Sequence, residues 1–175
     1  HGYSLTVDGI VGTNTINAIK DYQSKNGLVS DGIAGNNTYK KLDGTIPSSN
    51  KYRFPVNYIY VSQTYKSTHK AVDLGWSSKY YGSSQGIYAC FDGKVIVNSY
   101  ASDAGNYVAI RHDNGDVSRY LHLKSRSHLS IGTRVQKGEK VGIMGSTGRS
   151  TGPHLHFDLT KNGSRVNPLD YLYVY

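Results

Sequence analysis

The chain has 175 residues and a mass of 19.2 kDa, with 37% hydrophobic and 18% charged residues, a composition typical of one or two small globular domains. Its single cysteine, Cys90, excludes an internal disulfide and a zinc knuckle built on paired cysteines. Its single glutamate, Glu139, excludes the HExxH metalloprotease motif and a catalytic pair of glutamates. No apolar run reaches the roughly 18 residues that predict a membrane span.

The formal net charge is +8, with a pI of about 9.4. Residues 1–46 hold four lysines and four aspartates and are therefore neutral, so the whole excess of positive charge falls on residues 47–175. A basic excess of this size indicates a polyanionic partner such as nucleic acid, an acidic polysaccharide or an anionic cell wall. The alternative is a charged surface that only keeps the protein in solution.

The N-terminal part contains an internal repeat, because VDGIVGTNT at 7–15 recurs as SDGIAGNNT at 30–38. Each copy predicts an Asp-Gly turn followed by the cap of a short helix. Apolar residues at helical spacing follow the first copy, and Gly27 marks the end of that helix. We predict a small α-helical module over residues 1–46 and a linker over residues 47–53.

Beyond the linker, β-branched and aromatic residues form short runs separated by Gly, Asn and Asp. Runs of this kind predict strands joined by tight turns, such as the turn at Asn114-Gly115. We expect residues 54–175 to form a mainly antiparallel β domain. The expected strands are residues 58–61, 71–74, 86–91, 94–98, 107–112, 117–123, 140–144 and 154–160.

Three segments of this domain concentrate histidine. His154 and His156 are two residues apart, which on a strand puts both imidazoles on one face, and the same spacing predicts a shared face for Tyr120 and His122. A catalytic zinc takes three ligands from His and carboxylate and keeps one position for water. Two histidines and one aspartate would meet that need and leave two histidines for acid–base work. The segments are HKAVD at 69–73, YLHL at 120–123 and HLH at 154–156.

The N-terminal repeat resembles the type 1 peptidoglycan-binding domain. The resemblance is carried by the doubled DGI-x-G-x-x-T and by a helix with a Tyr22-Gln23 pair. That family has a further helix before the first turn, whereas this chain starts close to the turn. We therefore expect the sequence to be a fragment or a processed form of a longer protein. The alternative is a helical pair that only packs on the next domain.

Residues 54–171 resemble the M23 metallopeptidases, the lysostaphin-like or LytM-like peptidoglycan endopeptidases. The densest match is GSTGRSTGPHLHF at 145–157. Three further motifs support the resemblance and occur along the chain in the same order as in the family: His-x-x-x-Asp, Tyr-x-His-Leu and NPL at 167–169. The resemblance implies a zinc-dependent hydrolase of peptide bonds in the stem peptide or cross-bridge of bacterial peptidoglycan. The alternative is a catalytically silent M23-like module that binds the wall or a partner protein.

The resemblance also implies roles for individual residues. One Zn²⁺ is expected on three ligands, and two further histidines are expected to flank the activated water, one as base and one on the oxyanion. Tyr120 is a candidate to hydrogen-bond substrate, with a buried strand tyrosine as the alternative. The expected zinc ligands are His69, Asp73 and His156, and the expected catalytic residues are His122 and His154.

The remaining expectations concern the surroundings of the protein. Peptidoglycan and anionic wall polymers are the expected partners, and nucleic acid is not, because no helix-turn-helix or RNP signal is present. We expect a monomeric secreted bacterial or phage-encoded enzyme that works outside the cell at the wall. Cys90 is expected to be a small packed residue, and His112 and His128 are expected in exposed loops.

Overall fold

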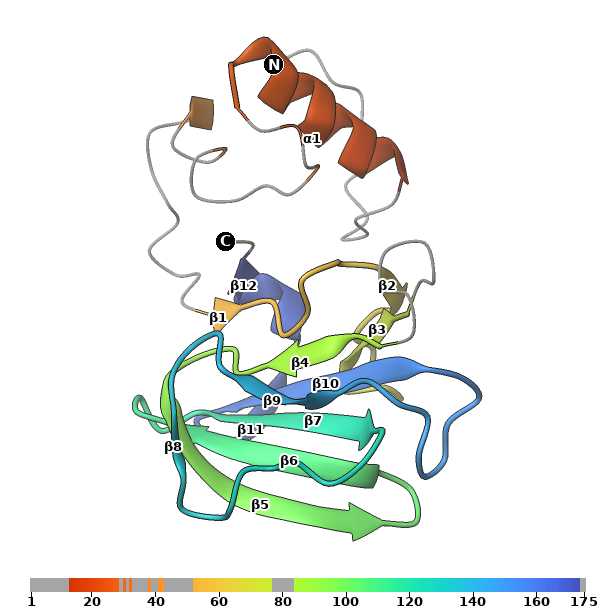
Figure 1. Ribbon diagram of the computed structural model, residues 1–175, viewed down its shortest axis with the longest axis vertical. Coiled ribbons are helices and arrows are strands. Elements are labelled where there is room, and N and C mark those ends of the chain that lie inside the picture. The colour runs from red at the N-terminus through yellow and green to blue at the C-terminus, as the bar shows by residue number, and fades with distance from the viewer. Residues whose placement is uncertain are drawn as a thin grey trace.

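The structure is a computed structural model that describes residues 13–28, 30, 32, 38, 41–42, 52–76 and 84–173 (Figure 1). The helical elements whose bounds lie within the described residues are α1 (Thr13–Lys25) and the 3-10 helix η1 (Pro168–Asp170). The strands are β1 (Tyr52–Arg53), β2 (Val61–Gln63), β3 (Val72–Gly75), β4 (Gly86–Tyr88), β5 (Gly93–Ala101), β6 (Gly105–His112), β7 (Val117–Leu123), β8 (Arg134–Val135), β9 (Lys140–Ile143), β10 (His154–Lys161), β11 (Ser164–Val166) and β12 (Leu172–Tyr173). The predicted fold class, a mainly antiparallel β domain after a small helical part, is confirmed. Among the described residues, no helix has the length and apolar character needed to cross a membrane.

Helix α1 carries the Tyr-Gln pair of the N-terminal repeat, and Tyr22 and Gln23 are its buried residues. The Gln23 side-chain amide accepts a hydrogen bond from the Gly32 backbone N–H at 2.9 Å and donates one to Thr38 Oγ1 at 3.1 Å. The glutamine therefore ties the second turn of the repeat to the helix. The helix ends shortly before Gly27, which has a φ of +68°, as the sequence predicts. The first turn of the repeat lies outside the described residues.

The main sheet has eight strands, and its neighbouring strands are antiparallel. Their order is β2-β3-β10-β7-β6-β5-β8, and β11 pairs with the far end of β10. Strand β10 therefore has β7 along one side and β3 and β11 along the other (Figure 1). The predicted turn at Asn114-Gly115 joins β6 to β7, and Gly115 adopts the φ of +88° that favours glycine.

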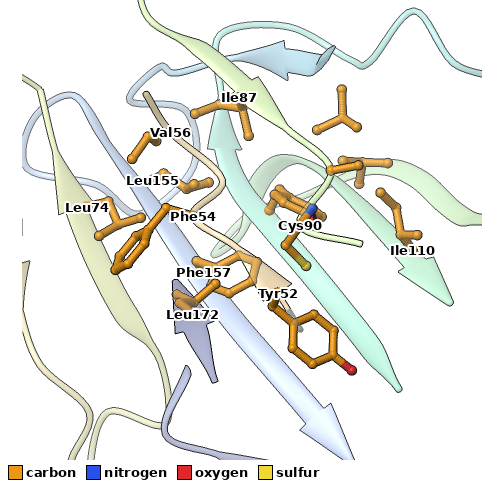
Figure 2. Close-up of a cluster of buried hydrophobic side chains, with 14 of the residues drawn as sticks. Tyr52, Phe54, Val56, Leu74, Ile87, Cys90, Ile110, Leu155, Phe157 and Leu172 are labelled. Carbon is orange, nitrogen blue, oxygen red and sulfur yellow. Dashed lines mark hydrogen bonds between the residues drawn. The ribbon is translucent and has the colours of Figure 1, made fainter. Parts of the chain in front are cut away.

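The hydrophobic core lies against one face of this sheet. Figure 2 shows Leu155 and Phe157 of β10 in one cluster with Ile87 of β4, a strand that pairs with β9. The parallel pair β1 and β12 adds Tyr52 and Leu172 to the same cluster. Tyr52 belongs to the last two residues of the predicted linker, which thus form a core strand. Because alternate residues of β10 fill the core, the residues between them face the other side of the sheet.

Candidate metal centre and active site

Strand β10 presents His154 and His156 on the face of the sheet that is opposite the core. The intervening Leu155 and the following Phe157 are fully buried, so the alternation of the strand places both imidazoles on one side, as predicted. His156 lies directly opposite Asp73 of β3. The sheet therefore joins two segments that are far apart in the sequence.

The side chains of His69, Asp73 and His156 converge at this point. Asp73 Oδ1 lies 2.9 Å from His156 Nδ1 and 3.2 Å from His69 Nε2, and the two imidazole nitrogens are 3.3 Å apart. His69 Nδ1 is 3.3 Å from the carbonyl oxygen of Thr64 and donates to it, which aims Nε2 at the other two groups. In the described part of the chain, no other group of three His, Cys, Asp or Glu side chains has this arrangement.

These three donor atoms fit a zinc ion. Zinc binds His nitrogen and carboxylate oxygen at about 2.0–2.2 Å in a tetrahedron, so that neighbouring ligand atoms lie about 3.3 Å apart. The three separations seen here are within about half an ångström of that value. The side chains of the three residues are 12–20% exposed, which leaves a side of the cluster open to water.

The protonation state of Asp73 also suits a metal ligand. Burial acts to raise the pKa of this carboxyl group, but the hydrogen bond from His156 and the electrostatic attraction of His156, His69 and His154 outweigh burial and lower the pKa from its ordinary value. The carboxylate is therefore ionised near neutral pH.

His122 and His154 stand beside the cluster. Their ring centroids are 4.7 Å apart, and the His122 ring is 5.9 Å from that of His156. His122 Nδ1 donates to the carbonyl of Thr147 at 2.8 Å, and His154 Nδ1 donates to the carbonyl of Gly152 at 2.8 Å. Each neutral ring then carries its free lone pair on Nε2, the atom that can accept a proton. Burial lowers the pKa of His122, which favours this neutral form.

A break in the regular alternation of β7 sets the direction of His122. Its φ is +62°, in the left-handed region, and the register between β6 and β7 shifts at this position. Tyr120 is paired with Phe157 and shares the core face with it. In a regular strand His122 would point to that same face, but the bulge turns it toward His154. The predicted shared face for Tyr120 and His122 is wrong.

Tyr120 belongs to the core rather than to the site. It is fully buried, and its hydroxyl accepts hydrogen bonds from the Cys90 N–H and from the Ser118 hydroxyl, both at 2.9 Å. Burial raises the pKa of this phenol well above its ordinary value. Since the hydroxyl is occupied on the core side of the sheet, the expectation that Tyr120 binds substrate is corrected here to the buried strand tyrosine.

The remaining expectations about single residues, for Cys90, His112 and His128, had different outcomes. Cys90 is a fully buried packed residue, as expected, and burial raises the pKa of its thiol to about 11. His112 was expected in an exposed loop but lies in β6 and is only 2% exposed. Its Nε2 is 2.8 Å from Ser118 Oγ and 3.4 Å from Cys90 Sγ. His128 is exposed, as expected.

Three positions that orient His122 and His154 were not recognised in the sequence. Thr147 and Gly152 supply backbone carbonyls, which any residue type could provide, so their identity carried no signal. Gly105 has a φ of +65°, and a Cβ at this position would collide with the Thr147 carbonyl. In the sequence, the only sign of this close approach of two backbone segments was that residue 105 is a glycine.

Comparison with known proteins identifies two related families. Residues 67–168 match peptidase family M23, and residues 1–42 match a family of peptidoglycan binding domains. The peptidoglycan DD-endopeptidase ShyC of Vibrio cholerae is 48% identical over 82 residues, which is 47% of this chain and 19% of ShyC. The DD-carboxypeptidase/endopeptidase Mpg of Neisseria meningitidis is 43% identical over 91 residues, 51% of this chain and 21% of Mpg. The chain thus spans about a fifth of the length of these relatives.

Solved structures share the fold. A peptidase M23 from Pseudomonas aeruginosa superposes with a TM-score of 0.60 at 30% identity, covering 71% of this chain and 51% of that one. A zinc-containing peptidase from Vibrio cholerae gives a TM-score of 0.52 at 31% identity, with 67% and 36% covered. The catalytic domain of lysostaphin from Staphylococcus simulans gives 0.51 at 27% identity, with 70% and 92% covered. With more than half of its residues matched by the family and the fold shared, the chain belongs to peptidase family M23.

Proposed function

We propose that the chain is a zinc-dependent endopeptidase that hydrolyses peptide bonds of bacterial peptidoglycan. One observation carries this proposal: three side chains suited to zinc converge on the open face of the sheet, and two further imidazoles with free Nε2 atoms adjoin them. The names of two relatives, DD-endopeptidase and DD-carboxypeptidase/endopeptidase, support the choice of substrate.

In this proposal His69, Asp73 and His156 hold the zinc ion. When bound, zinc would polarise the scissile carbonyl and lower the pKa of water to about 7. The remaining chemistry belongs to the pair of histidines beside the ligands. With two histidine nitrogens and one carboxylate as protein ligands, the metal site would keep open positions for water and for the substrate carbonyl.

His122 and His154 move the protons. One imidazole accepts a proton from the attacking water at Nε2 and gives it to the departing amine as the peptide bond breaks. The other imidazole, once it is protonated at both nitrogens, donates from Nε2 to the oxyanion that forms on the carbonyl, while its Nδ1–H stays on the backbone carbonyl. The Thr147 and Gly152 carbonyls fix the tautomer and the direction of the rings, so both Nε2 atoms are already in place before substrate binds.

The wider setting follows from the same proposal. Residues 1–46 form a wall-binding module, supported by the family match of residues 1–42, and residues 54–175 form the catalytic domain. The enzyme acts at the cell wall, outside the cytoplasmic membrane, on insoluble peptidoglycan, and works as a monomer. The basic residues that carry the net charge of +8 favour an anionic surface of this kind.

The test is mass spectrometry of purified peptidoglycans of several cross-bridge types after incubation with the protein. We expect new amine termini that disappear after treatment with a chelator and return when zinc is restored. The bond that is cut identifies the specificity. If no wall releases fragments although the protein holds one zinc per chain, the proposal is wrong and the chain is a silent module of the family.

A further inference from the structure

A row of basic side chains crosses the main sheet. Arg134 of β8 lies directly opposite Lys94 of β5, and Lys94 lies directly opposite Arg111 of β6. The same row continues through Val117 and Thr160 to Arg165 of β11. We call Arg134, Lys94, Arg111 and Arg165 the basic row. With strands about 4.8 Å apart, the row extends about 24 Å across six strands.

The basic row lies on the same face of the sheet as the candidate metal centre. Thr160 lies in register with the basic row, directly opposite Arg165. It follows His156 at an interval of four residues along β10, so both side chains point to one side of the sheet. The distance along the strand is about 13 Å at the usual rise per residue. Between them lies Asp158, which is fully buried and held by Arg119 with Nε–oxygen distances of 2.9 and 3.0 Å.

The central members of the row have no compensating charge among the described residues. Arg134 is paired with Asp113, and Arg165 Nε is 3.8 Å from the carboxylate of Asp158, which Arg119 already occupies. Lys94 and Arg111 are exposed, and neither forms an ion pair within residues 52–76 and 84–173. Two cations that face each other on neighbouring strands therefore stand without a counter-charge.

This arrangement costs stability in the isolated domain. Like charges directly opposite on antiparallel strands repel each other, and Lys94 has a cation on both sides. An anion on this face would remove the repulsion and gain an attraction. The charges are spread in a line across the sheet and do not converge on one point. A polymer with repeated anionic groups matches that spacing better than a single phosphate does.

We propose that the basic row binds a linear phosphodiester polymer of the bacterial cell wall. The polymer lies across the strands on the open face of the sheet, and its phosphates contact Lys94, Arg111 and Arg165. The match of residues 1–42 to peptidoglycan binding domains favours a wall polymer over other polyanions. Binding holds the enzyme on the wall with the site of hydrolysis about 13 Å away on the same face.

The test uses the full chain and soluble poly(glycerol phosphate) as the probe, with affinity measured by fluorescence anisotropy at several salt concentrations. The double variant Lys94→Gln/Arg111→Gln should bind about 10- to 30-fold more weakly and with a smaller dependence on salt. The matched control is Arg126→Gln/Lys140→Gln, which loses the same charge at two exposed positions outside the row. It should bind within about threefold of the unchanged protein.

Thermal unfolding separates a folding defect from a binding defect. Because the double variant removes opposed cations, its melting temperature should equal or exceed that of the unchanged chain. Equal weakening in the row variant and the control would show that only net charge matters and would overturn the proposal. Tighter binding of duplex DNA than of the wall polymer at physiological salt would overturn the choice of partner. Neither outcome depends on peptide hydrolysis, so the proposed endopeptidase activity stands or falls separately.

Discussion

Asp73 and His156 face each other across β3 and β10, with Asp73 Oδ1 2.9 Å from His156 Nδ1. The two residues are neighbours only because the sheet pairs their strands. His154, the next residue of β10 on the same face, is thereby placed beside the candidate metal centre. The HLH segment thus divides into one ligand and one acid–base residue in the proposed site.

That division predicts different results for the two histidines. His156→Ala removes a ligand, so the variant should lose bound zinc and activity together. His154→Ala should keep one zinc per chain but lose about 100- to 10,000-fold in turnover, the usual contribution of a general acid or base. Metal analysis by mass spectrometry and a wall-release assay measure both properties. If both variants retain zinc at the level of the unchanged protein, the ligand assignment is wrong.

The positive φ of His122 orients its ring toward the site but is expected to lower the stability of the fold. A non-glycine residue in the left-handed region costs about 1 kcal/mol or more. His122→Gly should therefore be about 1 kcal/mol more stable to urea than His122→Ala, although both lose the hydrogen bond to Thr147 and both lose turnover. Equal stability of the two variants would contradict the bulge at this position.

The contact between Gly105 and Thr147 predicts a positioning effect. In Gly105→Ala the new methyl group meets the Thr147 carbonyl that holds His122 Nδ1, so turnover should fall at least tenfold while zinc content is unchanged. Gly115→Ala is the matched control, because Gly115 also has a positive φ but has open space around its Cβ position. Steady-state assays should show nearly unchanged turnover in the control. A similar loss in both variants would mean that backbone strain, and not displacement of Thr147, is the cause.

The burial of His112 predicts a dependence of stability on pH. Burial lowers the pKa of His112 from 6.5 to about 4. Between these values the unfolded chain binds a proton that the folded chain does not, so the contribution of His112 is fully present above pH 6.5 and is lost as the pH falls toward 4. The shift corresponds to about 3 kcal/mol.

Urea unfolding at pH 7.5, 6 and 5 measures this effect. The unchanged protein should lose more stability over this range than His112→Gln, which does not titrate. All other titrating groups are common to both chains, so the difference between the two curves belongs to His112. Parallel curves would contradict the burial of a neutral imidazole at His112.

Much of the β domain could be predicted from the sequence because its strands are marked by local patterns. Runs of β-branched and aromatic residues predicted β5, β6, β7 and β10 to within a few residues. The Asn114-Gly115 pair predicted the turn between β6 and β7. The two-residue strands β1, β8 and β12 were missed. They are too short to show alternation, and pairing with distant strands is what makes them extended.

The sequence by itself determined the family, the order of the strands along the chain and the set of residues suited to zinc chemistry, because these depend on residue type and short-range spacing. The tertiary structure decided which way individual side chains point. The bulge at His122 brings that ring to the site while Tyr120 and His112 turn into the core, and the register of β5 with β6 aligns Lys94 with Arg111. A single shift in register or one positive φ moves the side chain of a strand residue to the other face of the sheet. The alternation of apolar and polar residues in the sequence predicts neither.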